Sequence, residues 1–94
     1  MKNRYERIQE ILETTFKPAL LEIVDESAKH ANHAGRNGLP AGETHYRVLM
    51  VATALEGQSR VVRSRAVHEA LDAEFKTGLH ALSLRLQTPG EVAG

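Results

Sequence analysis

One run of branched and apolar residues constrains the fold more than any other part of the sequence. It spans residues 43–53 (ETHYRVLMVAT), and residues 48–51 are apolar at every position. Because successive side chains of a strand point to opposite faces, the run predicts a β-strand whose second half is covered on both faces. The remaining elements of the chain must therefore pack around this strand.

Two stretches show the three-to-four-residue apolar spacing of an amphipathic helix. The first begins after Asn3, a candidate N-cap with Glu6 three residues on, and Pro18 prevents it from continuing. The second follows Ser59, which can cap it, and ends at residues 76–78 (KTG). We expect this second stretch to bend near Ser64 and form two short helices.

Two further strands are predicted, at residues 19–25 (ALLEIVD) and 79–87 (LHALSLRLQ). The order helix, strand, strand, one or two helices, strand predicts an α+β fold, in which helices cover a three-stranded mixed sheet. The first two strands are expected to be antiparallel, and the last to return parallel after the helical crossover. The 94 residues suit a single domain, 1–94, with a long functional loop at 26–42 and a flexible tail at 88–94.

Composition excludes several classes of function. The chain has no cysteine, which rules out disulfides and any metal site built from its own thiolates. Its 12 basic and 12 acidic side chains cancel, and tryptophan is absent, so neither a basic field nor an aromatic platform favours nucleic acid. Without an apolar leader or a long apolar run, we expect a cytoplasmic protein that does not contact membranes.

Four stretches, in this order, carry a resemblance to a known family. They are residues 25–27 (DES) followed by His30, residues 40–48 (PAGETHYRV), Gly57 before residues 63–67 (RSRAV), and residues 79–82 (LHAL). From about Arg7 to Pro89 the chain resembles the BolA family.

The resemblance implies a fold like the type II KH domain, with the element order α-β-β-α(α)-β. It also implies binding to monothiol glutaredoxins, with or without a bridging [2Fe–2S] cluster, and a role in iron–sulfur cluster trafficking or iron regulation. Some members of the family are described as DNA-binding transcriptional regulators, which is the alternative function for this chain.

The five histidines are the residues that fit cluster chemistry. A [2Fe–2S] cluster needs four ligands, and a chain without cysteine can supply only imidazole nitrogens to one iron. The resemblance implies that a glutaredoxin cysteine and a glutathione thiolate supply the sulfur ligands. Because imidazole binds a metal only in its neutral form, the shared cluster should weaken as the pH falls through about 6.

The resemblance implies that His80 and His30 are the two nitrogen ligands, with His33 as the alternative loop ligand. From the residues alone, His80 is better explained as a partly buried histidine with an internal hydrogen bond, and His30 as a solvated loop residue. His45 is a possible secondary ligand, although its place at a strand entrance favours a structural or surface role. His68 is expected to face solvent.

Three arginines, Arg60, Arg63 and Arg65, open the second helical stretch directly after Gly57. They could bind an anion, dock the glutaredoxin or the glutathione carboxylates, or contact DNA. The second glycine of a Gly-x-x-Gly nucleic-acid loop is missing. We favour the simpler interpretation, in which the arginines form a solvated helix face and pair with acids such as Glu69.

The resemblance, together with the histidines and the neutral net charge, thus implies a non-enzymatic adaptor that forms a heterodimer with a monothiol glutaredoxin. Glu43 and His45 could suggest acid–base catalysis, but no positioned nucleophile accompanies them. The isolated chain is expected to be a monomer or weak dimer and to hold no cluster by itself.

Overall fold

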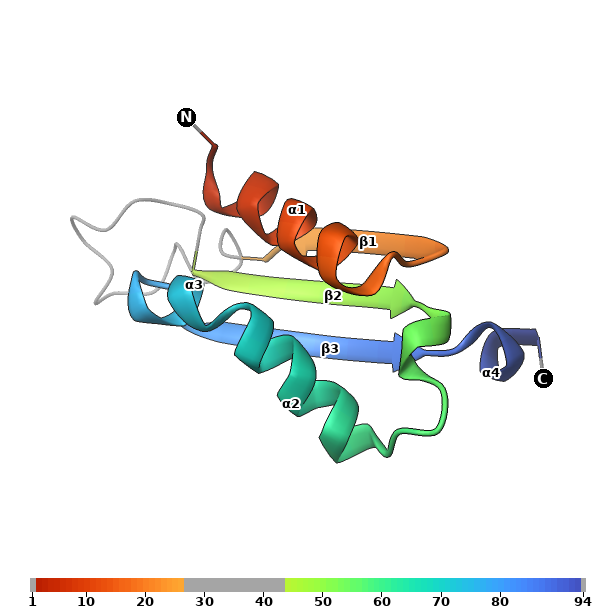
Figure 1. The fold of residues 1–94 in the computed structure, drawn as a ribbon. Helices are drawn as coiled ribbons and strands as arrows, with labels where there is room; N and C mark the ends of the chain where they lie inside the picture. Colours follow the sequence, from red (N-terminus) through yellow and green to blue (C-terminus); the bar gives the residue numbers. More distant parts are fainter. Residues whose placement is uncertain (1, 27–43, 94) are drawn as a thin grey trace.

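The first helix, α1 (Arg4–Phe16), begins and ends at local signals in the sequence (Figure 1). The computed structural model describes residues 2–26 and 44–93. Asn3 Oδ1 accepts the N–H of Glu6 at 2.8 Å, and Glu6 Oε1 accepts the N–H of Asn3 at 3.1 Å. The predicted capping box is therefore confirmed. Lys17 closes the helix in the left-handed conformation, with a φ of 49°, directly before Pro18.

The sheet has three strands, β1 (Leu20–Asp25), β2 (His45–Val51) and β3 (Ala81–Gln87). Their order is β1-β2-β3, so β2 is hydrogen-bonded on both sides. β1 runs antiparallel to β2, and β3 runs parallel to it. The predicted α+β fold, mixed sheet and pairing directions are confirmed.

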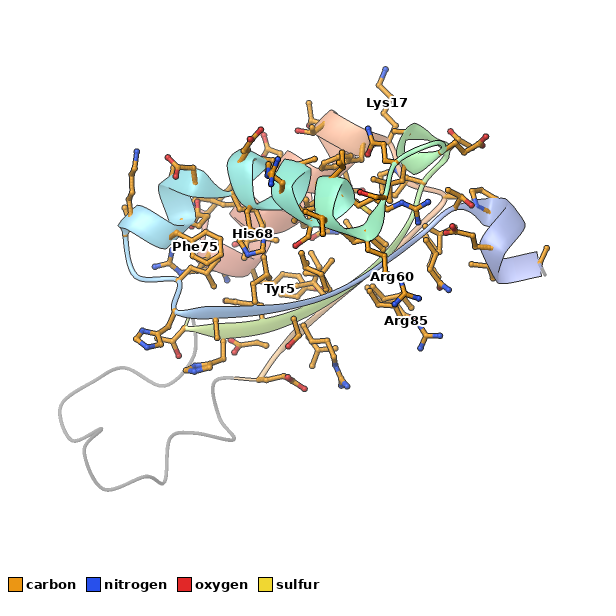
Figure 2. All side chains as sticks on the ribbon, turned by 90° about the horizontal axis from the view of Figure 1, so that it is seen from below. Tyr5, Lys17, Arg60, His68, Phe75 and Arg85 are labelled. Carbon is orange, nitrogen blue, oxygen red and sulfur yellow. The ribbon has the colours of Figure 1, made fainter. Side chains whose placement is uncertain are left out.

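The hydrophobic core lies between the sheet and the helices, which gather on one face of the sheet (Figures 1 and 2). The largest side chains that are fully buried are Ile8, Leu12, Val48, Met50, Leu55, Val67 and Leu71. They come from α1, β2 and the β2–β3 crossover. Burial of each is worth about 1.5–3 kcal/mol, so this layer holds the sheet in place.

None of the helices in the described residues lies over the opposite face of the sheet (Figure 2). The prediction that both faces of β2 are covered is therefore only partly right. Val51 is 5% exposed, but Leu49 is only half-buried. Leu49 lies in register between Glu22 of β1 and Arg85 of β3. The stems of such long side chains can shield an apolar neighbour without a further layer of structure.

The crossover from β2 to β3 contains a 3₁₀ helix (Thr53–Leu55), α2 (Arg60–Ala70) and α3 (Asp72–Lys76). Ser59 Oγ accepts the N–H of Val62 at 3.2 Å, so the predicted cap is confirmed. The predicted bend at Ser64 is wrong, because α2 continues through it and breaks at Leu71. Leu71 has a non-helical ψ of 15° and is fully buried, so the break keeps its side chain in the core.

A short helix, α4 (Pro89–Ala93), lies in the segment that we expected to be a flexible tail. Glu91 Oε1 accepts the N–H of Thr88 at 2.8 Å, and Thr88 Oγ1 accepts the N–H of Glu91 at 3.3 Å. Pro89 is well suited to the first position of a helix.

The predicted functional loop at 26–42 lies outside the described residues, apart from Glu26. Within the described ranges, no helix combines the length and the apolar character needed to cross a membrane.

Candidate functional site

Two histidines, His45 and His80, lie together at the end of the sheet where β2 and β3 begin. His45 is opposite Ala81 in the parallel register. The carbonyl oxygen of Thr44 accepts the N–H groups of His80 and Ala81, at 2.8 and 3.0 Å. The ring centroids of His45 and His80 are 5.7 Å apart, and the ring planes are inclined by 36°. The backbone therefore brings two imidazoles to one place.

The two rings have different surroundings. His80 is exposed, whereas His45 is half-buried and its Nδ1 lies 2.9 Å from Thr44 Oγ1. The family resemblance implied His80 as a ligand and His45 only as a secondary candidate, whereas the interpretation of His80 as a partly buried residue is wrong, because its side chain is exposed. The sequence gave no sign that the two are neighbours, because that follows from the register of strands far apart in the chain. His30 and His33, the predicted loop ligands, lie outside the described residues.

The turn that leads into His80 is fastened to α1 by Arg4. Arg4 Nη1 donates to the side chain of Glu74 at 2.8 Å and to its carbonyl oxygen at 3.0 Å, and Nη2 donates to the carbonyl oxygen of Thr77 at 2.9 Å. Arg7 binds the same carboxylate, and the side chains of Arg4 and Glu74 are both buried. No local pattern in the sequence predicts this cluster, since its members come from distant elements.

His68 stands apart from this pair, on α2. It is exposed, as predicted, and its Nδ1 lies 2.8 Å from the carbonyl oxygen of Ser64. Its ring stacks on Phe75, with centroids 5.2 Å apart and planes inclined by 12° (Figure 2). His68 therefore has a local structural role and is a suitable control residue.

The three predicted anion-binding arginines do not form one solvated face. Arg63 is only 7% exposed, and its guanidinium donates to Glu91 at 2.7 and 3.0 Å and to the carbonyl oxygens of Leu86 and Gln58. The preferred interpretation is therefore wrong for Arg63, because its partner comes from α4 rather than from its own helix. The hydrogen bond from Arg63 lowers the pKa of Glu91 to about 2, and the same bond raises the pKa of Arg63.

A groove of about 570 Å³ runs between α2 and β3. It is lined by Arg60, Arg63, Ser64, His68, Leu82, Leu84, Arg85, Leu86 and Gln87. Arg60 and Arg85 lie near each other at one part of it (Figure 2). Arg65 does not line it. Sequence reasoning missed Arg85, which lines the same groove as Arg60 because β3 lies beside α2.

Comparison with known proteins agrees with this geometry. The family model described as BolA-like protein matches residues 12–91. The chain belongs to the BolA family. The predicted resemblance is thereby confirmed.

Relatives within the BolA family are similar over almost the whole chain. Protein BOLA1, chloroplastic, from Arabidopsis thaliana is 43% identical over 91 residues, which cover 97% of this chain and 57% of that protein. The solved structure of BolA1 from Arabidopsis thaliana matches with a TM-score of 0.86 and covers 97% of both chains. The DNA-binding transcriptional regulator BolA of Escherichia coli is 38% identical over 90 residues, or 95% of this chain and 79% of that protein. This chain thus spans little more than half of the first of these relatives.

The donor set at the sheet end consists of two imidazoles, which suit a metal ion but leave most of its coordination positions open. Within residues 2–26 and 44–93, no three His, Cys, Asp or Glu side chains are grouped so that they could hold a metal ion. His45 and His80 offer imidazole nitrogens, and His80 is accessible from outside. Imidazole is a ligand for iron, copper, nickel and zinc.

Proposed function

We propose that this BolA-family chain is a non-enzymatic adaptor that binds a monothiol glutaredoxin and shares a [2Fe–2S] cluster with it. The observation that carries the proposal is the position of His80. Its ring is exposed, and its backbone is fixed by the bond to Thr44. A ligand shared between two proteins must be reachable by both and held still by one. Because the chain has no cysteine, the sulfur ligands would be a glutaredoxin cysteine and a glutathione thiolate.

His80 would supply one nitrogen ligand and His30 the other, with His33 as the alternative. Imidazole in place of thiolate removes negative charge around the iron, which raises the reduction potential of such a cluster. The second nitrogen ligand, from His30 or His33, would therefore come from outside the three strands of the sheet. We place the function of the complex in iron–sulfur cluster trafficking or iron regulation.

Reconstitution with a purified monothiol glutaredoxin, glutathione, ferrous iron and sulfide tests the proposal. The mixed complex should show a visible circular dichroism spectrum distinct from that of the glutaredoxin homodimer. His80→Ala should abolish this spectrum, and so should one of His30→Ala and His33→Ala. His68→Ala is the matched control and should leave it unchanged. An unchanged spectrum in a variant that lacks His30, His33 and His80 contradicts the proposal.

The pH dependence of the same spectrum gives a second test. Nitrogen ligation requires neutral imidazole, so the mixed spectrum should fade as the pH falls through about 6. The glutaredoxin homodimer with thiolate ligands alone provides the control. A profile for the mixed complex that matches the control would count against histidine ligation.

DNA binding is the second candidate function. It is favoured by the groove that both Arg60 and Arg85 line, and by the similarity to the DNA-binding transcriptional regulator BolA of Escherichia coli. Guanidinium groups are suited to phosphate oxygens. The balanced net charge of the chain argues against strong non-specific attraction, so we place this function second.

A salt titration with a DNA duplex tests the second candidate. If the groove binds phosphate, the affinity falls steeply with salt, and Arg60→Ala with Arg85→Ala reduces the slope by about two. Arg65→Ala should have a smaller effect, because Arg65 does not line the groove. Absence of binding at low salt removes this candidate.

A further inference from the structure

The pair formed by His45 and His80 has the spacing of two rings on one metal ion. With a metal–nitrogen distance of about 2.0 Å, each ring centre lies about 3 Å from the ion, so two ring centres lie about 5 to 6 Å apart. The observed distance is 5.7 Å. The ring planes are inclined by 36°, so the rings are not stacked on each other.

The backbone holds the two residues that carry these rings side by side before any ion binds. Thr44 O accepts two successive N–H groups from the start of β3, at 2.8 and 3.0 Å, while His45 follows Thr44 directly at the start of β2. Ligands fixed in advance lose little conformational freedom on binding, which favours affinity.

Thr44 also offers the outer hydrogen bond that metal-bound histidines commonly make. Its Oγ1 lies 2.9 Å from His45 Nδ1. In the tautomer in which Nδ1–H donates to this oxygen, Nε2 is the nitrogen that would bind the metal ion. The Thr44 hydroxyl would thus orient the His45 ring and leave Nε2 as the nitrogen that binds the metal ion.

We propose that His45 and His80 together bind one divalent transition-metal ion, such as Ni²⁺, Cu²⁺ or Zn²⁺, on the isolated chain. The two imidazoles occupy two coordination positions of the ion, and water molecules occupy the remaining positions. The site goes beyond the adaptor function, because it needs neither the glutaredoxin nor the loop histidines. His80 would be a ligand of both the divalent ion and the shared cluster. The chain could therefore not hold the ion and the cluster at the same time.

Ni²⁺ titration of the untagged full chain by isothermal calorimetry tests this site. His45→Ala and His80→Ala should each weaken Ni²⁺ binding by at least about tenfold. The His30→Ala/His33→Ala double variant should change it by less than about twofold, and His68→Ala should do the same, because coordination here depends only on the two rings at the sheet end. Far-ultraviolet circular dichroism of each variant confirms that the fold persists.

Thr44→Val keeps the shape of the residue and removes the hydroxyl, which covers the case in which His45→Ala fails to fold. It should weaken Ni²⁺ binding by about tenfold, as expected for loss of an outer-shell partner. Loss of binding in the loop double variant, normal binding in Thr44→Val and His45→Ala, or no Ni²⁺ binding by the unmodified chain overturns the proposal. The two proposals fail separately, because only the divalent-ion site needs His45 and only the shared cluster needs His30 or His33.

Discussion

At the scale of single residues, Arg4 fixes a turn that lies far along the chain. Its guanidinium is buried and donates to the Glu74 carboxylate and to two backbone oxygens, of Glu74 and Thr77. A buried charge is tolerated only where partners replace water. Because two of these partners are backbone carbonyls, the guanidinium sets the path of the chain into His80 as well as the position of α3.

Arg4→Met should lower the free energy of unfolding by about 3 kcal/mol, the lower end of the range for breaking a buried ion pair. The loss stays at that end because Arg7 still binds the Glu74 carboxylate. Urea unfolding measures the effect. Lys76→Ala, which removes an exposed pair with Asp72, is the control and should cost less than about 1 kcal/mol. Equal losses in the two variants would contradict the role given to Arg4.

Gly78 allows Arg4 to approach the turn. Its φ is 129°, and an added Cβ would lie 2.9 Å from Arg4 Nη2. Gly57 is the matched control, because its φ is 79° and an added Cβ would meet nothing within 4 Å. We expect Gly57→Ala to cost about 1 kcal/mol and Gly78→Ala clearly more, about 2 kcal/mol, since the guanidinium must also move.

A double-mutant cycle separates the two contributions at Gly78. In the Arg4→Met background, Gly78→Ala should cost clearly less than in the unmodified chain, because the guanidinium is no longer there to be displaced and only the backbone strain at a φ of 129° remains. Thermal or urea unfolding of the four proteins gives the coupling. If the cost of Gly78→Ala is unchanged in that background, the close approach to Arg4 does not contribute to the loss of stability.

At the scale of elements, an ion pair joins α4 to α2. Arg63 is nearly buried on α2, and Glu91 reaches it from the first turn of α4. Hydrogen bonding to this guanidinium lowers the pKa of Glu91 from 4.5 to about 2. The folded state therefore binds this proton less readily than the unfolded chain, and the pair stabilises the fold whenever the carboxylate is ionised.

The stabilisation by Glu91 should depend on pH in a defined window. It is complete above the ordinary pKa of 4.5 and is lost as the pH falls toward about 2. The difference in melting temperature between the unmodified chain and Glu91→Gln should thus be constant near neutrality and shrink in acid. Glu10→Gln, which affects an exposed pair with Lys2, should change the melting temperature little at neutral pH. A difference for Glu91→Gln that persists unchanged down to about pH 2 would refute the assignment.

The elements that could be predicted from the sequence are those with local signals. The capping residues Asn3, Glu6 and Ser59 mark the starts of α1 and α2 correctly, because a cap acts within one turn of its own helix. The break at Leu71 was missed, since core packing rather than local propensity determines it. Thr88 and Glu91 have the spacing of a capping box, which is a local signal for α4 within the segment expected to be a flexible tail.

The candidate site could be predicted only in part, because proximity depends on register. The family motif indicates His80, but the 5.7 Å distance to His45 requires the parallel pairing of β2 with β3. The burial of Arg63 likewise requires a partner from another element. Arg85 appears in the sequence as an ordinary polar residue of an alternating strand, and only the packing of α2 brings Arg60 near it.

At the scale of the whole molecule, the charge balance affects self-association and solubility. The 12 basic and 12 acidic side chains give a net charge of +0 at pH 7, so little long-range repulsion keeps copies apart. Solubility at low salt should therefore be lowest near pH 7 and rise on either side. Arg65→Glu, at an exposed position on α2, should raise the solubility at pH 7 by making the net charge negative. Precipitation curves against pH measure both effects.

The parallel pairing of β2 and β3 also has a kinetic consequence. His45 and His80 become neighbours only after the entire α2–α3 crossover has been closed, and such non-local pairing is slow to form. An ion held by these two rings stabilises contacts that we expect to be absent from the folding transition state. Stopped-flow measurements with Ni²⁺ should accordingly show slower unfolding and an unchanged refolding rate, so that metal occupancy would lengthen the lifetime of the native chain.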